Sequence, residues 1–552
     1  MKVMFIVNDL GLNEPFGPMI LSAILKQKGH EVALGALKKE NVEEKIAAFN
    51  PDILAYSMMS VDMLDMKKFN DALRKKKNIF TLLGGAHASL YPKSIDDPMI
   101  DAICVGEGDA AIVDVVDCIE EGRSLEGIPN ILLSSDRPLN KRNLIEDLDS
   151  VPFMDRELVY SYPEMGNFGV KGIWASRGCP FPCPYCFNNR YNATFKDNGR
   201  IVRRRSVDSV IEETKRLVSE YRVDFIRIQD DVFVLKVDDW IKEFAEKFPS
   251  EIGIPYYALM RAESLTDEMA YYLKKSGCFS LAMSIETAND DIREKMLRRK
   301  GTKQQFEEAF KNAKKHKINV YANTMLAMPF TTLGHDIESL DFVMKVKPQM
   351  PNFSIFMPYP GTDLGDYCLD AGVYNPEKNP INYGMRNASP LNCFTKREVN
   401  AQYNLCELGI VAVKFPRLRN LIVNRLIYWK PNKIFFFIHY LFSITAYGRK
   451  VFSFKHSIKE YVELIIRTFK HYLYDFTKEE KKETINEPDS CLIVEDKSRW
   501  ASILSGRRFK ETVNPAFDLE KRSVELEKCM DIMVTKRAYL SKKVENSGQV
   551  VM

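Results

Sequence analysis

Short apolar runs alternate with amphipathic segments over most of the first 375 residues, and this alternation limits the fold more than any other feature. From residue 1 to about 125 the runs are KVMFIV, EVALGA, ILAYSMM, NIFTLLGG and AICVGEG. In the segments between them, apolar residues recur every three or four positions, as they do on one face of a helix. The pattern predicts an α/β fold with a doubly wound parallel sheet, which binds ligands at the carboxyl ends of its strands.

A second series of runs begins near residue 168 with VKGIWAS and continues through FIRIQDD, YYALMR, SLAMSIE, NVYANTMLAMP and NFSIFMPY. Six such βα units predict a partial (β/α)6 barrel, in which chemistry gathers at the carboxyl ends of the strands. We therefore expect a first domain over residues 1–125, a connector over 126–167, the barrel over 168–375 and a mainly α-helical C-terminal region over 376–552.

The C-terminal region is rich in aromatic residues, and its longest apolar run, Ile434 to Tyr447, has 14 residues. A membrane span needs about 20. The run is therefore predicted to be a buried helix, with a membrane-surface helix or a lid over an apolar substrate left open. Because it follows the sixth strand, we expect the C-terminal region to cap the barrel mouth, with Trp429, Phe436 and Tyr440 among its candidate lining residues for an apolar substrate. The segment KEEKKETINEPDS is predicted to be a solvated linker.

Charge and composition narrow the setting. The 552 residues include 79 Lys and Arg against 75 Asp and Glu, mixed throughout, which gives no electrostatic reason for a nucleic-acid partner. The apolar run within the first residues, MKVMFIVND, is too short to form the core of a signal peptide. We therefore expect a cytoplasmic protein. Cytosolic thiols stay reduced, so the eleven cysteines indicate metal binding or catalysis rather than a disulfide framework.

Three cysteines, Cys179, Cys183 and Cys186, fall within eight residues in the stretch ASRGCPFPCPYCFNN, after the first strand of the second series. Structural zinc usually takes two separated pairs of ligands, and no second pair follows here. A [4Fe–4S] cluster held by three cysteines leaves one iron without a protein ligand, available to a substrate or cofactor. The spacing therefore favours a [4Fe–4S] cluster.

The spacing Cys-x3-Cys-x2-Cys, with Tyr185 before the last cysteine, resembles the radical S-adenosylmethionine superfamily. The resemblance covers roughly residues 168–375 and implies that S-adenosylmethionine binds the open iron. An electron donor such as ferredoxin or flavodoxin would then drive its cleavage to a 5′-deoxyadenosyl radical. The positions that match the family's S-adenosylmethionine site are Tyr185, Asp230, Asp231, Arg261, Ser284 and Glu286.

Two structural alternatives stay open: Arg261 and Glu286 as a simple ion pair, and Asp230 and Asp231 as helix caps. The segments MLAMPFTT and FSIFMPYPGTDL also resemble the family's fifth and sixth strand ends. The chain departs from the family at Ala327 and Thr287, where relatives usually have Gly and Ser.

A Rossmann-like domain with GGAHASLYP and VGEGDAA ahead of such a barrel resembles the cobalamin-binding subclass. That resemblance implies a corrin near Ser57, Ser60, Gly84, Gly85, His87 and Glu107. After the first strand the chain has NDLGLNEPFGPM, without the Asp-x-His-x-x-Gly stretch by which many cobalamin proteins ligate cobalt. We therefore expect no histidine ligand to cobalt, and predict that His87 hydrogen-bonds the cofactor or the domain itself.

The subclass implies a methyltransferase that acts on an unactivated carbon, or on phosphorus, through a 5′-deoxyadenosyl radical and methylcobalamin. One alternative is a cyclase, ring-contracting or oxidising enzyme without net methylation. Another is a non-catalytic iron–sulfur or corrin sensor. The expected partner is a small-molecule or lipid-like substrate. Membrane association is left open but not favoured, and no catalytic side chain is identified.

Replacing Cys179, Cys183 and Cys186 together by Ala should abolish iron binding, because no other thiols stand at cluster spacing. Iron and sulfide content and the visible absorbance of anaerobically reconstituted protein measure this. A triple variant that keeps its iron and its brown colour would place the cluster elsewhere.

Overall fold

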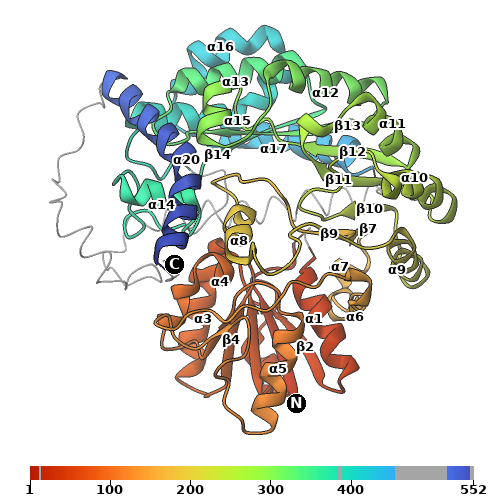
Figure 1. Ribbon diagram of the computed structural model, residues 1–552. Helices are drawn as coiled ribbons and strands as arrows, with labels where there is room; N and C mark the ends of the chain where they lie inside the picture. Colours follow the sequence, from red (N-terminus) through yellow and green to blue (C-terminus); the bar gives the residue numbers. More distant parts are fainter. Residues whose placement is uncertain (12–13, 382–387, 454–465, 467–518, 548–552) are drawn as a thin grey trace.

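The computed structural model describes residues 1–11, 14–381, 388–453, 466 and 519–547 (Figure 1). Its N-terminal sheet has the strand order β2-β1-β3-β4-β5-β6. All strand pairs are parallel except β5 with β6. The strands are β1 (Lys2–Val7), β2 (Glu31–Ala36), β3 (Ile53–Ser57), β4 (Phe80–Gly84), β5 (Ala102–Cys104) and β6 (Ile131–Leu132). The last of these comes from the segment expected to be a connector, so that segment also supplies an edge strand.

The strand order reverses between β1 and β3, which lie side by side although β2 separates them in sequence. In doubly wound sheets, ligands bind in the crevice at such a point, outside the carboxyl ends of the strands. The helices are α1 (Phe16–Gln27), α2 (Val42–Phe49), α3 (Met63–Arg74), α4 (Ala86–Leu90) and α5 (Asp109–Glu120). Two short helices, α6 (Glu157–Tyr160) and α7 (Pro163–Gly166), lead into the second domain.

The second sheet is the predicted partial barrel, with six parallel strands in the order β14-β13-β12-β11-β10-β7. Its strands are β7 (Val170–Ile173), β10 (Phe225–Ile228), β11 (Tyr256–Met260), β12 (Cys278–Met283), β13 (Asn319–Leu326) and β14 (Met350–Ile355). Its outer helices are α9 (Val207–Glu220), α10 (Asp239–Glu251), α11 (Asp267–Lys275), α12 (Lys303–Lys315) and α13 (Leu333–Val346). Each of these helices contacts the next in order, as Figure 1 shows, so they cover the convex face of the sheet.

Alternation along each barrel strand separates the two faces. Tyr256 packs against Phe244 and Phe248 of α10 on the outer side. The next residue, Tyr257, therefore faces the interior of the barrel, and its register partner Ser280 does the same. This inner face is the surface that the C-terminal region meets.

The described part of the C-terminal region is mainly helical, and α15 (Lys396–Lys414) packs on the edge strand β14. Two further helices, α16 (Arg419–Asn424) and α17 (Lys433–Ala446), pack on α15. A one-turn π-helix, η8 (Tyr447–Val451), then enters the barrel. There Phe452 packs on Phe225 and Tyr257, and Ser280 donates a hydrogen bond to the Val451 carbonyl at 2.5 Å.

These contacts lie in the amino-terminal halves of the strands, at the end of the barrel opposite the cysteine loop. This part of the C-terminal region therefore meets the amino-terminal end of the barrel and not the mouth, where the region is expected to cap the active site. Trp429 is exposed and stacks on Phe435, and Phe436 stacks on Tyr440 within α17. Apolar residues of this region form the floor of the barrel and the outer layer around α15.

A different C-terminal helix, α20 (Leu519–Ser547), reaches the carboxyl ends of the strands. It packs on η5 (Ile292–Met296), in the loop after β12, and on α14 (Asp363–Asp370), after β14 (Figure 1). Arg298 joins these parts, because it donates a hydrogen bond to the Met533 carbonyl at 2.6 Å and pairs with Asp363 at 2.8 Å.

Among the described helices, none combines the length and apolar character needed to cross a bilayer. The expected linker, residues 478–490, lies outside the described part of the chain.

Candidate functional site

The three cysteines lie on the loop between the first barrel strand and helix α8 (Phe187–Phe195). A short ribbon, β8 (Ser176–Arg177) paired with β9 (Arg203–Arg204), holds the start of this loop. Cys183 is buried, whereas Cys179 and Cys186 are partly exposed. Burial raises the pKa of Cys179 to about 11 and that of Cys186 to about 12, and the charges of the neighbouring thiols add to the increase. Iron ligation stabilises the thiolate and so opposes this effect.

The donor set on this loop fits a [4Fe–4S] cluster. Three cysteine thiolates would ligate three of its irons, whereas structural zinc needs a fourth ligand to complete its tetrahedron.

A charged network borders the cysteines and includes four of the residues predicted for S-adenosylmethionine. The Tyr185 hydroxyl donates to the Glu286 carboxylate at 3.0 Å, and Arg299 pairs with the same carboxylate at 3.2 Å. The Ser284 carbonyl accepts a hydrogen bond from Arg299 at 2.9 Å. Arg261 lies 3.4 Å from the Cys183 sulfur.

Arg261 and Glu286 each have another partner, so a simple ion pair between them is not what the structure contains. Arg261 pairs with Glu263, which also lies 3.3 Å from Arg299. Burial raises the pKa of Glu286, and the Arg299 charge opposes that increase. Glu263 and Arg299 were not predicted from the sequence. Glu263 lies two residues after the predicted Arg261, and Arg299 lies in the loop after β12, which also carries Ser284 and Glu286.

The backbone is strained where this network meets the strand ends. Glu286 has φ 63°, and Ala327 and Phe330, after β13, have φ 56° and 63°. Non-glycine residues at positive φ are uncommon, and they cluster at ligand sites where the surrounding structure holds them. The positive φ at Ala327 is a backbone conformation that Gly adopts without steric cost.

The two aspartates after β10 have different environments. Asp230 is buried and accepts hydrogen bonds from the Ala175 amide at 2.8 Å and the Ser176 hydroxyl at 2.7 Å. It therefore holds the segment that leads into the cysteine loop, rather than capping a helix. Asp231 is exposed to a cavity between the two domains.

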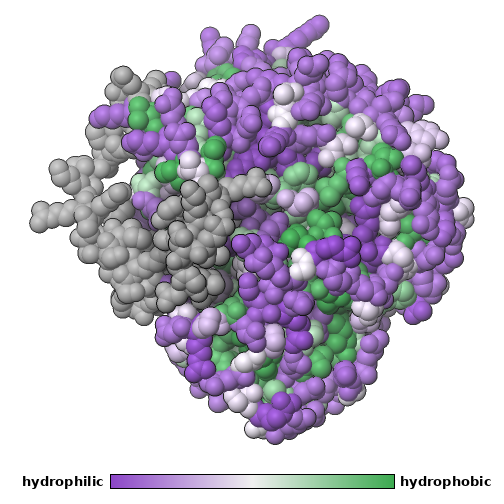
Figure 2. All heavy atoms as spheres, viewed as in Figure 1, coloured by the Kyte–Doolittle hydropathy of each residue, from purple (hydrophilic) through white to green (hydrophobic). Residues whose placement is uncertain are grey.

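This cavity, of ≈ 380 Å³, lies at the carboxyl ends of both sheets, and its size is in the range of small-molecule sites. Figure 2 shows hydrophobic residues along the seam between the domains. Residues of the first domain supply one wall, among them Phe5, Gly17, Leu21, Ser57, Gly84, Gly85, Gly106, Glu107 and Asp109. The barrel domain supplies the other wall, including Trp174, Ser176, Arg177, Gly178, Asn188, Arg203, Gln229 and Asp231.

The residues of the first wall fit a corrin cofactor. Three of its glycines, Gly84, Gly85 and Gly106, lie at the carboxyl ends of β4 and β5, where backbone can approach a bulky ligand closely. A Cβ at Gly85 would come within 2.9 Å of the Met58 backbone, and φ there is 90°. Apolar side chains such as Phe5 and Leu21 and charged ones such as Glu107 and Asp109 both line the cavity, as an amphipathic cofactor requires.

Of the six residues predicted for cobalamin, Ser57, Gly84, Gly85 and Glu107 line the cavity, whereas Ser60 and His87 are not among its lining residues. His87 is buried, and its ring nitrogens lie 3.0 Å from the Ser60 hydroxyl and 2.9 Å from the Ser94 hydroxyl. Burial lowers the pKa of His87 to about 4. Its hydrogen bonds therefore serve the domain itself, one of the two roles predicted for it.

An ion-pair cluster joins the two walls, and the sequence did not reveal it. Arg177, two residues before Cys179, donates to both carboxylate oxygens of Asp109 at 2.8 and 3.1 Å. Glu107 pairs with Arg203 at 2.8 Å and with Arg177 at 3.2 Å. Burial alone would lower the pKa of Arg177, but the two carboxylates raise it above its ordinary value.

A second link between the domains is Glu14, from the loop between β1 and α1. Its buried carboxylate accepts a hydrogen bond from the Gly172 amide at 3.0 Å and lies 3.3 Å from the Gln229 amide nitrogen. It also accepts a hydrogen bond from the Tyr160 hydroxyl. A polar residue in a loop carries no sign in sequence that it will enter a neighbouring domain.

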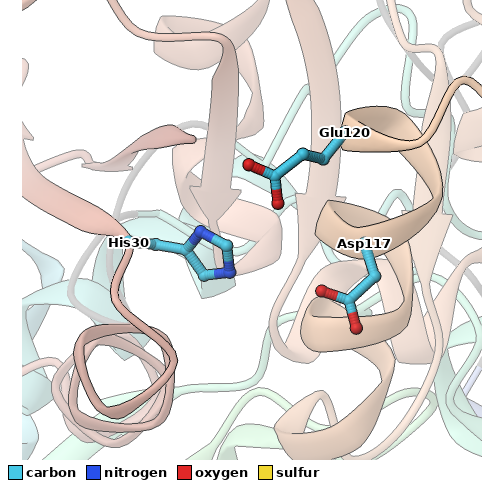
Figure 3. Close-up of side chains that lie close together, drawn as sticks. All are labelled: His30, Asp117 and Glu120. Carbon is cyan, nitrogen blue, oxygen red and sulfur yellow. The ribbon is translucent and has the colours of Figure 1, made fainter.

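One other group of metal-ligating side chains lies at the opposite end of the first sheet (Figure 3). His30 faces Asp117 and Glu120, which lie on successive turns of α5. The amino group of Met1 lies 3.2 Å from the His30 ring and 3.6 Å from Glu120. These contacts account for the group as a partly exposed charge cluster, and we assign no metal to it.

Comparison with known proteins identifies both domains. Residues 5–116 match the B12 binding domain, and residues 175–343 match the Radical SAM superfamily. The chain is 27% identical to an uncharacterized methyltransferase of Pyrococcus horikoshii, over 64% of this chain and 78% of that protein. It is 25% identical to the cytidylyl-2-hydroxyethylphosphonate methyltransferase of Streptomyces wedmorensis, over 66% and 79% of the two chains. It is 24% identical to the anaerobic magnesium-protoporphyrin IX monomethyl ester cyclase of Rubrivivax gelatinosus, over 59% and 60%.

Two solved structures share the fold. The cobalamin-dependent S-adenosylmethionine radical enzyme OxsB, with aqua-cobalamin and S-adenosylmethionine bound, superimposes with a TM-score of 0.59 and 14% identity, over 98% of this chain and 81% of that one. The radical S-adenosylmethionine methyltransferase TsrM of Kitasatospora setae, with cobalamin and a [4Fe–4S] cluster bound, gives 0.57 and 16%, over 73% and 81%.

His87 should not ligate cobalt, because both its nitrogens are held by serine hydroxyls. Electron paramagnetic resonance of the cob(II)alamin form should give the same nitrogen splitting in wild type, His87→Ala and His87→Gln. The Gln variant keeps hydrogen-bonding groups at the site, in case Ala disturbs folding. A splitting present in wild type and lost in both variants would contradict this assignment.

The resemblance that the sequence carried is thus confirmed in both domains. A radical SAM domain implies a [4Fe–4S] cluster and S-adenosylmethionine, and a B12 binding domain implies cobalamin. The chain thus joins a B12 binding domain to a domain of the Radical SAM superfamily, and it shares its fold with cobalamin-dependent radical enzymes that have the same pair of domains.

Proposed function

We propose that this enzyme is a methyltransferase that acts on an unactivated carbon, or on phosphorus, of a small molecule. The observation that carries the proposal is the single cavity with walls from both domains. Gly84 and Gly106 of the B12 binding domain and Asp231 of the radical SAM domain line it, and Glu107 pairs with Arg177 where the two walls meet. A methyl donor and a radical generator can act on one substrate only if they share such a space.

The residues that would hold each cofactor are distinct. Cys179, Cys183 and Cys186 would ligate the cluster, and the glycines after β4 and β5 would receive the corrin. We assign S-adenosylmethionine to the space bordered by Tyr185, Arg261 and Glu286. When bound, the cluster with S-adenosylmethionine supplies a 5′-deoxyadenosyl radical, and cobalamin supplies a transferable methyl group.

The protein's own part is to position the cofactors and to exclude water. Arg299 and Glu263 fix the side chains of Glu286 and Arg261 through paired charges, so that the network needs little rearrangement when a ligand arrives. We assign the shielding of the barrel mouth to α20. Arg298 ties this helix to Asp363, which also accepts a hydrogen bond from Asn189 of the cysteine helix α8 at 3.0 Å. A cytoplasmic electron donor such as ferredoxin or flavodoxin would supply the electron.

A second candidate is a cyclase or another radical enzyme without net methylation, because the relatives also include a cyclase. Both candidates need the same cavity and the same cofactors. They differ in whether the methyl group leaves S-adenosylmethionine for the product. A non-catalytic sensor would have no need of the network around Glu286.

We expect that holoenzyme given S-adenosylmethionine with a deuterated methyl group will transfer that label to a metabolite and release 5′-deoxyadenosine. Mass spectrometry of a metabolite extract, with and without enzyme, measures both products. A Cys183→Ala variant that keeps cobalamin is the matched control and should form neither.

Each other outcome contradicts the proposal in its own way. Release of 5′-deoxyadenosine with an unlabelled, altered metabolite would identify the cyclase or oxidising class. Formation of neither product, by protein with full cluster and cobalamin content and a complete extract, would favour the sensor.

A further inference from the structure

Helix α17 and the segments beside it present large apolar side chains to solvent. We call the residues concerned the α17 surface: Phe415 (48% exposed), Trp429 (57%), Ile434 (68%), Phe437 (45%) and Leu441 (46%). Single exposed apolar residues are normal on soluble proteins, whereas a contiguous group marks an interaction site.

The centre of the α17 surface is one stripe. Ile434, Phe437 and Leu441 are three and four positions apart, so they share one side of the helix. Phe415 and Trp429 flank the two ends of the helix: Phe415 packs on Phe442, with ring centroids 5.7 Å apart, and Trp429 stacks on the buried Phe435 at 6.0 Å.

The opposite side of α17 is already used. Phe435, His439 and Ser443 are buried, and the helix packs on α15. The core therefore does not require the apolar residues on the exposed side. Because both sides carry apolar residues, α17 is apolar all round. Helices of this kind occur where a second apolar phase covers the outer side.

The charged residues in the stretch of sequence around the α17 surface are basic. No Asp or Glu occurs in the sequence between Glu407 and Glu460. Exposed basic residues in the described part of this stretch are Lys414, Arg417, Arg425, Lys430, Lys433, Arg449 and Lys450. An acidic residue of a neighbouring helix, Asp341 of α13, faces this stretch and pairs with Arg419 at 2.8 Å.

We propose that the α17 surface docks on an anionic lipid bilayer, with α17 lying in the headgroup region. Aliphatic and aromatic side chains would enter the boundary of the acyl chains, while Lys and Arg on both flanks meet lipid phosphates. With its 14 residues α17 is about 21 Å long, which suits an interfacial position and not a span of about 30 Å. Nucleic acid would satisfy the positive charge but offers nothing to the aliphatic stripe.

The proposal does not depend on the reaction, so its test can use any well-folded holoprotein. Flotation with vesicles of phosphatidylcholine, alone or mixed with phosphatidylglycerol, is the direct measurement. Wild type should float with the mixed vesicles and remain at the bottom with phosphatidylcholine alone, and high salt should weaken binding through screening.

Two variants separate the contributions. Ile434→Ser, Phe437→Ser and Leu441→Ser together remove the apolar stripe, and Lys430→Glu with Lys433→Glu reverses charge beside it. Each should lower the bound fraction by about tenfold or more, since binding scales with both apolar area and attraction to anionic lipid. The control is Val218→Ser with Tyr271→Ser, exposed apolar residues on α9 and α11, which should bind as wild type does. Equal thermal unfolding of all four proteins shows that each is folded.

Several results would overturn the proposal. One is folded wild type that does not float, or a stripe variant that floats as well as wild type. Another is a wild-type dimer, without lipid, that the stripe variant converts to monomer, which makes the surface a contact between copies. A third is binding of single-stranded RNA that the charge variant loses and the stripe variant keeps.

Discussion

The arrangement of the active site depends on the paired charges of Arg177. This side chain directly precedes Gly178 and Cys179, and it bonds Asp109 of the other domain with both arms of its guanidinium. Arg is suited to this role because its planar fork matches a carboxylate and keeps its charge. Arg203 lies opposite Arg177 on the β8–β9 ribbon and pairs with Glu107. Both strands of this ribbon are therefore fixed to the start of α5. The cluster ligands therefore have a defined place relative to the glycines that would receive the corrin.

Most of the fold could be predicted from sequence because it rests on local patterns. The two series of apolar runs became the two parallel sheets, and the glycines after β4 and β5 did line the cavity. The three cysteines were recognisable because their spacing is itself the chemical requirement. These features depend on neighbours in the chain, and such neighbours are visible in a sequence.

Features that depend on distant contacts could not be predicted in this way. Arg177 and Asp109 are both ordinary surface residue types, and only the docking of two domains brings them together. Ser60 and His87 lie close in the chain to residues that line the cavity, yet they bond one another instead. The aromatic C-terminal run was expected at the barrel mouth, but the strand ends are reached by α20. The hydrophobic pattern of a sequence indicates that a helix is apolar, but it does not indicate which end of a barrel the helix contacts.

The central claim is that the corrin lies in the cavity between the domains, beside the loop that carries the cluster, and that the ion pairs of Arg177 hold the two sites together. The most direct test is the magnetic interaction between cob(II)alamin and the reduced cluster, measured by pulsed electron paramagnetic resonance on the holoprotein. We predict a resolved spin–spin coupling in wild type, and a broader distribution of couplings in Arg177→Met that retains both cofactors. Spectra of the doubly loaded wild-type protein that equal the sum of the two isolated centres would contradict the account.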